Sequence, residues 1–193
     1  MAFSKTLAEM EQNVPDSDAR KKLNALFDED SFNELDKFLS ADGAVGSVVS
    51  GYGTVNGATV YAYAQDVSVK GGAVDKSAAL KIKKLYELAA KNGAPVVAVF
   101  DSKGGDINEG MEVLADYGDI IKASAAISGV VPQITAVFGH CGGGLAVVQG
   151  LSDFTFMEEK DAKLFVNAPN TIAGNSTQKC DSASAKFQAE EAG

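Results

Sequence analysis

The fold is decided by the stretch Pro95-Val96-Val97-Ala98-Val99-Phe100-Asp101-Ser102-Lys103-Gly104-Gly105-Asp106. An apolar run of strand length leads into a glycine-rich turn, and a helix-like pattern begins after it at Ile107. The same order recurs where residues 133–138 precede Gly139-His140-Cys141-Gly142-Gly143-Gly144. We interpret both as strand–turn–helix junctions, where backbone N–H groups can face a ligand oxygen.

The residues around these junctions predict the remaining elements. Asn56-Gly57 separates two apolar-rich runs and is a strong hairpin signal. In the second run, Val60, Ala62 and Ala64 alternate with larger or polar residues, as in a strand that is buried on one face. We expect strands over 47–55, 58–65, 95–100, 133–138, 153–157 and 163–166, and helices over 2–13, 19–27, 77–91, 107–128, 143–150 and 184–192.

An opening hairpin followed by alternating strands and helices predicts an α/β fold, with a mainly parallel sheet flanked by helices. The apolar stripe of the helix over 107–128 is expected to be Met111, Leu114, Ile120 and Ile121. The spacing of the elements and the glycine turns at the strand ends resemble the crotonase-like (ClpP/crotonase) spiral of β-β-α units. The length of 193 residues suits one domain.

Composition excludes several classes of function. The net charge is −9, with 17 Lys and Arg against 26 Asp and Glu, which argues against nucleic-acid binding. The two cysteines, Cys141 and Cys180, and one histidine cannot form a disulfide framework or a four-ligand zinc site, so no metal is expected. The first thirty residues contain no apolar run long enough for a signal peptide or membrane span. We therefore expect a cytoplasmic protein without a membrane span.

The chemistry at the two turns is expected to depend on the backbone. The chain has no Gly-x-Ser-x-Gly elbow, no phosphate-binding loop and no Gly-x-Gly-x-x-Gly after a strand. Two preorganised N–H groups suit an enolate formed from a thioester, and each donor is worth about 3–4 kcal/mol. Glycine allows the backbone to approach a ligand closely. The catalytic candidates are Gly143, Gly144, Gly104 and Gly105.

Residues 23–157 resemble the N-terminal half of the biotin-dependent acyl-CoA carboxyltransferases. The matching motifs keep their order and spacing, which makes the resemblance more specific than any one of them. They include Gly51–Gly57, Gly71-Gly72-Ala73, the helix with Lys81-Ile82, Asp101-Ser102, Ser128–Ile134 and Gly139-x-Cys141-x-Gly143-Gly144.

The resemblance implies a crotonase-type fold whose N half binds acyl-CoA, and a C half that binds biotin across an interface. Gly143 and Gly144 would then donate oxyanion N–H groups. The CoA site would be lined by Gly71, Gly72, Ala73, Lys81, Lys103 and Asp106. The chain 1–193 would be a single N-half domain with a helical segment over 1–40, lacking the C-terminal half. Implied partners are a C-half subunit, a biotin carboxyl carrier protein and further copies in an oligomer.

The first turn departs from the family. The family commonly has Asp-Ser-Gly-Gly-Ala-Arg, whereas this chain loses a cation at Asp106 and gains one at Lys103. Two other functions therefore stay open. One is a stand-alone enoyl-CoA hydratase or isomerase, for which Glu109 and Glu112 are the nearest acids. The other is a non-catalytic acyl-CoA-binding subunit, which the change at Lys103 and Asp106 would signal.

Overall fold

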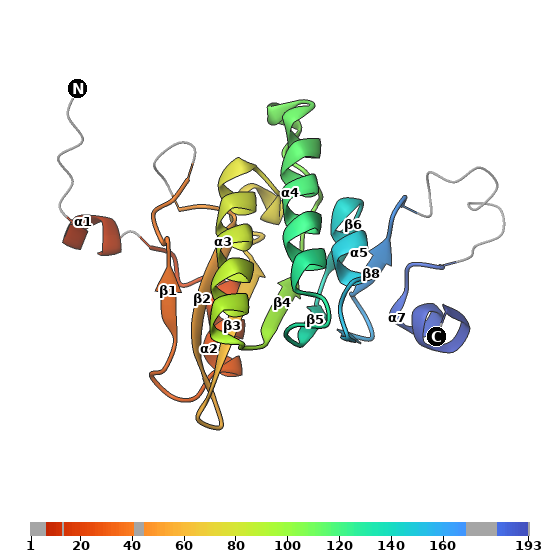
Figure 1. Cartoon of the computed structure of the whole chain (residues 1–193). Coiled ribbons are helices and arrows are strands. Elements are labelled where there is room, and N and C mark those ends of the chain that lie inside the picture. The colour runs from red at the N-terminus through yellow and green to blue at the C-terminus, as the bar shows by residue number, and fades with distance from the viewer. Residues whose placement is uncertain (1–6, 13, 41–44, 169–180, 193) are drawn as a thin grey trace.

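The computed structural model describes residues 7–12, 14–40, 45–168 and 181–192 (Figure 1). The helices are α1 (Leu7–Gln12), α2 (Asp18–Leu26), α3 (Lys76–Asn92), α4 (Glu112–Ile127), α5 (Gly144–Gln149) and α7 (Ala185–Phe187), with the single turns η1 (Lys70–Gly72) and η2 (Ile107–Glu109) and the π-helical η4 (Gln188–Ala192). The strands are β1 (Asn33–Leu35), β2 (Val48–Val55), β3 (Ala58–Gln65), β4 (Val96–Phe100), β5 (Gln133–Val137), β6 (His140–Gly142), β7 (Phe154–Met157) and β8 (Lys163–Phe165).

The main sheet has the strand order β1-β2-β3-β4-β5-β7. The hairpin predicted at Asn56-Gly57 is confirmed, because Val55 pairs with Ala58 across it. β1, β2 and β3 are antiparallel, whereas β3, β4, β5 and β7 run parallel. Figure 1 shows α3 and α4 side by side over the sheet, so the expected α/β architecture is confirmed.

A second line of short extended segments follows the parallel strands. Val74 comes after β3 and forms a parallel bridge with Gly105, which comes after β4. The Ser102 N–H donates to the His140 carbonyl at 2.8 Å, and β6 then pairs in parallel with β8. Each unit therefore contributes a long strand, a short segment and a helix, which is the expected β-β-α spiral. The sequence had indicated only a turn where β6 forms.

Two apolar layers bury the sheet. One cluster packs α3 and α4 on the sheet, and the other packs Leu23 and Phe27 at α2 against the opposite face. All residues of β3 from Val60 to Gln65 are buried. The prediction of a half-buried strand was therefore wrong there, because helices cover both faces of the sheet at β3.

The long helix expected over 107–128 is interrupted. Gly110 has φ 59° and ψ −129°, which ends η2, and α4 begins at Glu112. Met111 and Leu114 are 83% and 65% exposed, so the expected apolar stripe was wrong at its N-terminal end. The side chains of α4 that are buried are Ile120, Ser124 and Ile127.

The ends of the chain depart from the expected ranges in smaller ways. The helix expected over 2–13 is described only as α1, and residues 1–6 and 13 lie outside the described residues, as does Cys180.

No helix in the described ranges is both long enough and apolar enough to cross a bilayer.

Gly118 of α4 is expected to limit stability. No atom lies within 4 Å of a methyl group placed there, and its backbone is helical. We expect Gly118→Ala to raise the free energy of unfolding by about 0.5–1 kcal/mol, because alanine loses less backbone entropy in a helix. Chemical denaturation measures this change.

Gly93 provides the matched control for Gly118. Its surroundings are equally open, but φ is +62° at the C-terminal cap of α3. Gly93→Ala is expected to lower the free energy of unfolding by about 1 kcal/mol, because an L side chain is strained in that conformation. Equal effects of the two substitutions would contradict the argument from backbone conformation.

Candidate active site at the carboxyl ends of the parallel strands

Three segments predicted to bind or react with the substrate lie together beyond β3, β4 and β5. The Lys103 N–H donates to the Gly71 carbonyl at 3.0 Å, and the Val74 N–H donates to the Gly104 carbonyl at 2.9 Å. The His140 carbonyl accepts from Ser102, which joins the second turn to the first. The fold therefore brings Gly71–Ala73 and the two glycine turns into one region.

Buried Gln65, at the end of β3, joins two of these segments. Its side-chain amide donates to the Gly72 carbonyl at 3.2 Å, and its amide oxygen accepts from the Asp101 N–H at 3.2 Å. The sequence signal for this link between Gly72 and Asp101 is a polar residue, Gln65, at the end of an apolar strand.

The backbone amides of the four catalytic candidates divide into two kinds. The Gly104 N–H donates to the Ser102 hydroxyl at 3.1 Å, and the Gly143 N–H donates to the Phe165 carbonyl at 3.1 Å. These two amides are already engaged within the protein. The bond to Phe165 was not foreseen, since β8 lies in the next unit of the spiral.

The amides of Gly105 and Gly144 differ from these. Among the described residues, no hydrogen bond from either N–H is found. The bridge to Val74 uses the Gly104 carbonyl and the Asp106 N–H, so the Gly105 N–H faces the other side. Gly144 is the first residue of α5, where a helix has no internal acceptor for the N–H group. One unpaired donor thus comes from each turn.

Both of these glycines pack against Tyr117 of α4. A methyl group at Gly144 would lie 2.5 Å from Cδ1 of Tyr117, and one at Gly105 would lie 3.3 Å from its Cε2. The methyl group at Gly105 would also lie 2.5 Å from Cγ2 of Val113. Neither position has room for a side chain unless a side chain of α4 or the turn itself shifts. The sequence reasoning missed Tyr117, although Val113, Tyr117, Ile120, Ser124 and Ile127 follow helical spacing once α4 begins at Glu112.

Two of the predicted CoA-binding side chains are turned into the protein. Lys81 is 1% exposed, and its Nζ donates to the Val48 carbonyl at 3.0 Å. Burial lowers the pKa of Lys81. The structure thus places the Lys81 ammonium group in the core, because its helix face packs on β2. The contact of Lys81 with a CoA phosphate stays a prediction.

Asp106 is likewise held by groups of the protein. It is buried, it accepts from the Asn108 N–H at 3.0 Å, and it forms an ion pair with Lys70 at 3.1 Å. The hydrogen bond from Asn108 and the ion pair lower the pKa of Asp106. This carboxylate caps η2, and its partners are groups of the protein.

Lys103 stays exposed beside the glycines. Its stem lies across Gly71, where an added methyl group would be 2.6 Å from Cδ of Lys103. Gly72 and Ala73 are buried, and the Ala73 carbonyl accepts from the Ser47 hydroxyl at 2.6 Å. Of the predicted CoA-binding residues, Lys103 is therefore the one that presents a cation to solvent.

Three other side chains near the turns, those of Cys141, Glu109 and Asp116, differ in their surroundings. Cys141 is fully buried, and burial raises its pKa to about 12, so the thiol stays protonated at neutral pH. The Glu109 carboxylate accepts from the Lys76 N–H at 3.1 and 3.2 Å, which places it at the start of α3. Burial and the neighbouring Glu109 raise the pKa of Asp116 to about 6.

No group of His, Cys, Asp and Glu side chains suited to a metal ion occurs within the described parts of the chain.

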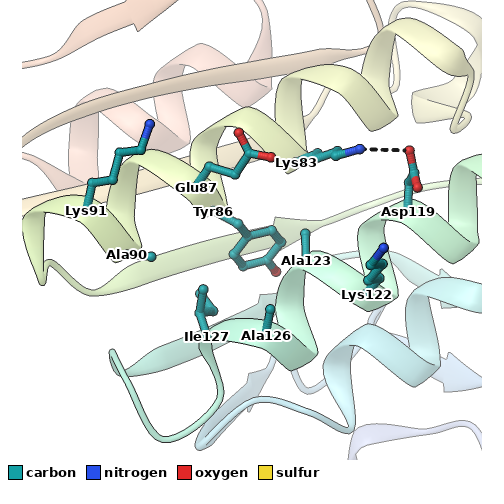
Figure 2. Close-up of a pocket in the computed structure, with 10 residues that line it drawn as sticks. All are labelled: Lys83, Tyr86, Glu87, Ala90, Lys91, Asp119, Lys122, Ala123, Ala126 and Ile127. Carbon is teal, nitrogen blue, oxygen red and sulfur yellow. Dashed lines mark hydrogen bonds and ion pairs between the residues drawn. The ribbon is translucent and has the colours of Figure 1, made fainter.

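Two cavities of the described residues differ in their place relative to the turns. One, of about 500 Å³, lies between the C-terminal halves of α3 and α4, as Figure 2 shows, with Ala90, Ala123 and Ile127 inside and the Lys83–Asp119 ion pair near its edge. The other, of about 1060 Å³, lies between β7 and the C-terminal helices. Helices that return antiparallel to the strands place their C-terminal halves at the opposite end of the sheet, so the first cavity is remote from the glycine turns.

A β-β-α spiral with glycine turns at the carboxyl ends of its parallel strands defines a protein of the crotonase-like class. Within this class, residues 17–186 match the carboxyl transferase domain, and the chain belongs to that family.

Three known proteins illustrate the relationship. The chain is 43% identical to methylmalonyl-CoA decarboxylase subunit alpha of Propionigenium modestum, over 80% of this chain and 32% of that protein. It is 38% identical to the propionyl-CoA carboxylase beta chain of Roseobacter denitrificans, with the same two shares. It resembles the structure of transcarboxylase 12S with hydrolysed methylmalonyl-coenzyme A bound, with a TM-score of 0.81 and 32% identity over 94% of this chain and 38% of that one. The chain thus spans about a third of the length of these curated relatives.

Proposed function

We propose that this chain is the acyl-CoA-binding half of a biotin-dependent carboxyltransferase. It would transfer a carboxyl group between biotin and an acyl-CoA, in the direction of a carboxylase or a decarboxylase. The observation that supports this most concerns the backbone N–H groups of Gly105 and Gly144. Neither has a hydrogen-bond partner among the described residues, and both glycines pack against Tyr117. The chain that carries them belongs to the carboxyl transferase family.

The proposed chemistry uses the backbone of both turns. When the α-carbon of an acyl-CoA loses a proton or a carboxyl group, negative charge develops on the thioester oxygen. The Gly105 and Gly144 N–H groups would stabilise that charge, while Gly104 and Gly143 keep the turns in shape through their own hydrogen bonds. Lys103, beside Gly71, would attract the anionic CoA moiety.

Asp101 and Glu109 fit a reaction in which neither of them acts as the general base. Asp101 accepts from the His140 N–H at 3.4 Å, and Glu109 accepts from the Lys76 N–H. Both carboxylates therefore accept hydrogen bonds from backbone N–H groups of the protein. Biotin, linked to a biotin carboxyl carrier protein and held by a C-half partner, would supply the carboxyl group and accept the α-proton.

An exposed apolar surface beside the first turn supports a partner there. Ile107 and Met111 are 90% and 83% exposed, and they lie two and six residues after Gly105 in the sequence. Large apolar side chains that are exposed close together in the sequence suggest an interaction site. We propose that the C-half partner covers this surface and encloses the two turns. The domain 1–193 would be the N half of that assembly.

Isotope exchange with the partner tests this function. The chain is purified with the C-half subunit, and labelled carboxyl exchange is measured between methylmalonyl-CoA or malonyl-CoA and a biotin analogue. We expect exchange that requires both proteins. Binding of CoA esters by calorimetry without any exchange in the assembled complex would instead identify a non-catalytic binding subunit. Turnover of enoyl-CoA by this chain alone would identify a hydratase or isomerase.

A further inference from the structure

Tyr117 lies between the two glycine turns. The ring atoms nearest a methyl group at Gly144 are Cδ1, Cγ and Cε1, at 2.5, 2.7 and 3.1 Å, whereas the one nearest Gly105 is Cε2, at 3.3 Å. Cδ1 and Cε1 form one edge of the ring, and Cε2 belongs to the other. The two glycines therefore border opposite edges of the same ring.

The helix that carries Tyr117 is held to the sheet. Ile120, Ser124 and Ile127 of α4 are buried. The Ser124 hydroxyl donates to the Gln133 side-chain oxygen at 2.8 Å, and the Gln133 amide donates to the Ser124 carbonyl at 3.1 Å. Because Gln133 begins β5, α4 has a defined position relative to the strand that leads into the second turn. A rigid ring on this helix can therefore hold both turns in place.

The hydroxyl group of Tyr117 has no structural partner in the described parts of the chain, since no hydrogen bond to it is found. Burial raises the pKa of Tyr117 to about 12, so the side chain is uncharged at neutral pH. The ring, and not the hydroxyl group, makes the contacts to Gly105 and Gly144.

We infer that Tyr117 is a positioning residue, whose ring holds the Gly105 and Gly144 N–H groups at the separation at which both reach one thioester oxygen. This inference rests on the proposed function for its catalytic consequence. Its structural part, the spacing of the two turns by one ring, stands on the contacts alone. Small displacements of catalytic groups are costly, since about 1 Å of misplacement can reduce a rate by about 10²-fold.

Three variants separate this role from a general loss of packing. Tyr117→Ala removes the contact to both glycines, Tyr117→Phe keeps the ring, and Val113→Ala removes a contact to Gly105 only. The amide resonances of Gly105 and Gly144 are followed by NMR of ¹⁵N-glycine-labelled protein without ligand. We expect Tyr117→Ala to shift both resonances, Tyr117→Phe to shift neither strongly, and Val113→Ala to shift that of Gly105 alone.

Carboxyl exchange by the complex with the C-half partner provides the second readout. Tyr117→Ala is expected to lower kcat by about 10²-fold with a much smaller change in KM for the acyl-CoA, and Tyr117→Phe is expected to restore the rate. The inference is overturned if Tyr117→Ala leaves either resonance in place, or if Tyr117→Phe is as slow as Tyr117→Ala. If the wild-type complex shows no exchange, the proposed function fails, while the resonances still decide whether Tyr117 spaces the turns.

Discussion

Replacing Gly144 by valine is expected to reduce carboxyl exchange by about 10²–10³-fold, the loss that follows removal of one oxyanion donor. A Cβ atom at this position would lie 2.5 Å from the Tyr117 ring, so the backbone of the second turn has to move away from α4. The Gly144 N–H then no longer lies where the thioester oxygen becomes anionic. The decisive measurement is kcat for exchange in the complex with the C-half partner.

Two comparisons show whether the lost rate comes from the amide. Gly118→Ala adds the same kind of atom to α4, near Tyr117 in sequence but in open space, and should leave exchange unchanged. Thermal unfolding of Gly144→Val is measured in parallel, and Gly144→Ala serves as the milder variant if the valine protein does not fold. A folded variant at Gly144 with wild-type kcat would remove this amide from the proposed mechanism.

Lys81→Ala is expected to lower the free energy of unfolding by about 2–5 kcal/mol, the usual cost of truncating a long buried side chain. The Lys81 stem fills space in the core, and its Nζ is a hydrogen-bond donor to the Val48 carbonyl. Losing that donor adds to the cost, because a buried carbonyl is left without its bond. Denaturant unfolding at neutral pH measures the change.

The dependence of stability on pH identifies the buried ammonium group. Burial lowers the pKa of Lys81 below its ordinary value of 10.5, so the unfolded chain binds more protons between the two pKa values. The contribution of Lys81 to stability therefore rises as the pH increases toward about 10.5, and it is lost as the pH falls through the folded-state pKa. Lys81→Met, which retains most of the apolar stem, should lack this rise.

Binding of acyl-CoA separates the structural role of Lys81 from the role expected from the family resemblance. The KM for acyl-CoA in Lys81→Met should match that of the wild-type complex, since the ammonium group does not reach solvent. A tenfold increase in KM in the folded Met variant would show instead that Lys81 contacts CoA.

Much of the fold could be predicted because its signals are local. Asn56-Gly57 specifies a tight turn by the backbone angles that these residues tolerate, and the strands on either side paired as expected. The apolar runs before the two glycine clusters became β4 and β5 for a similar reason. The start of α4 was missed because of Gly110, which interrupts the helix. Glycine residues also occur inside helices, so the conformation of Gly110 depends on the residues packed around it.

The structure brings the predicted site segments together, although it does not place each predicted side chain in the same region. The two glycine turns meet each other and also meet Gly71–Ala73, which the family resemblance had assigned to the CoA site. The burial of Asp106 and Lys81 could not be predicted, because a charged residue can be exposed or buried with a partner, and their partners Lys70 and Val48 come from other segments.

By itself, the sequence determined the order of most elements of the fold and the places of the two glycine turns. These properties follow from periodicity and from residues that act within a few positions of one another. Only the tertiary structure decided that the Gly143 amide is bound to Phe165 and that Tyr117 separates Gly105 from Gly144. The physical reason is that a backbone hydrogen bond or a packing contact depends on what another unit of the spiral places opposite it.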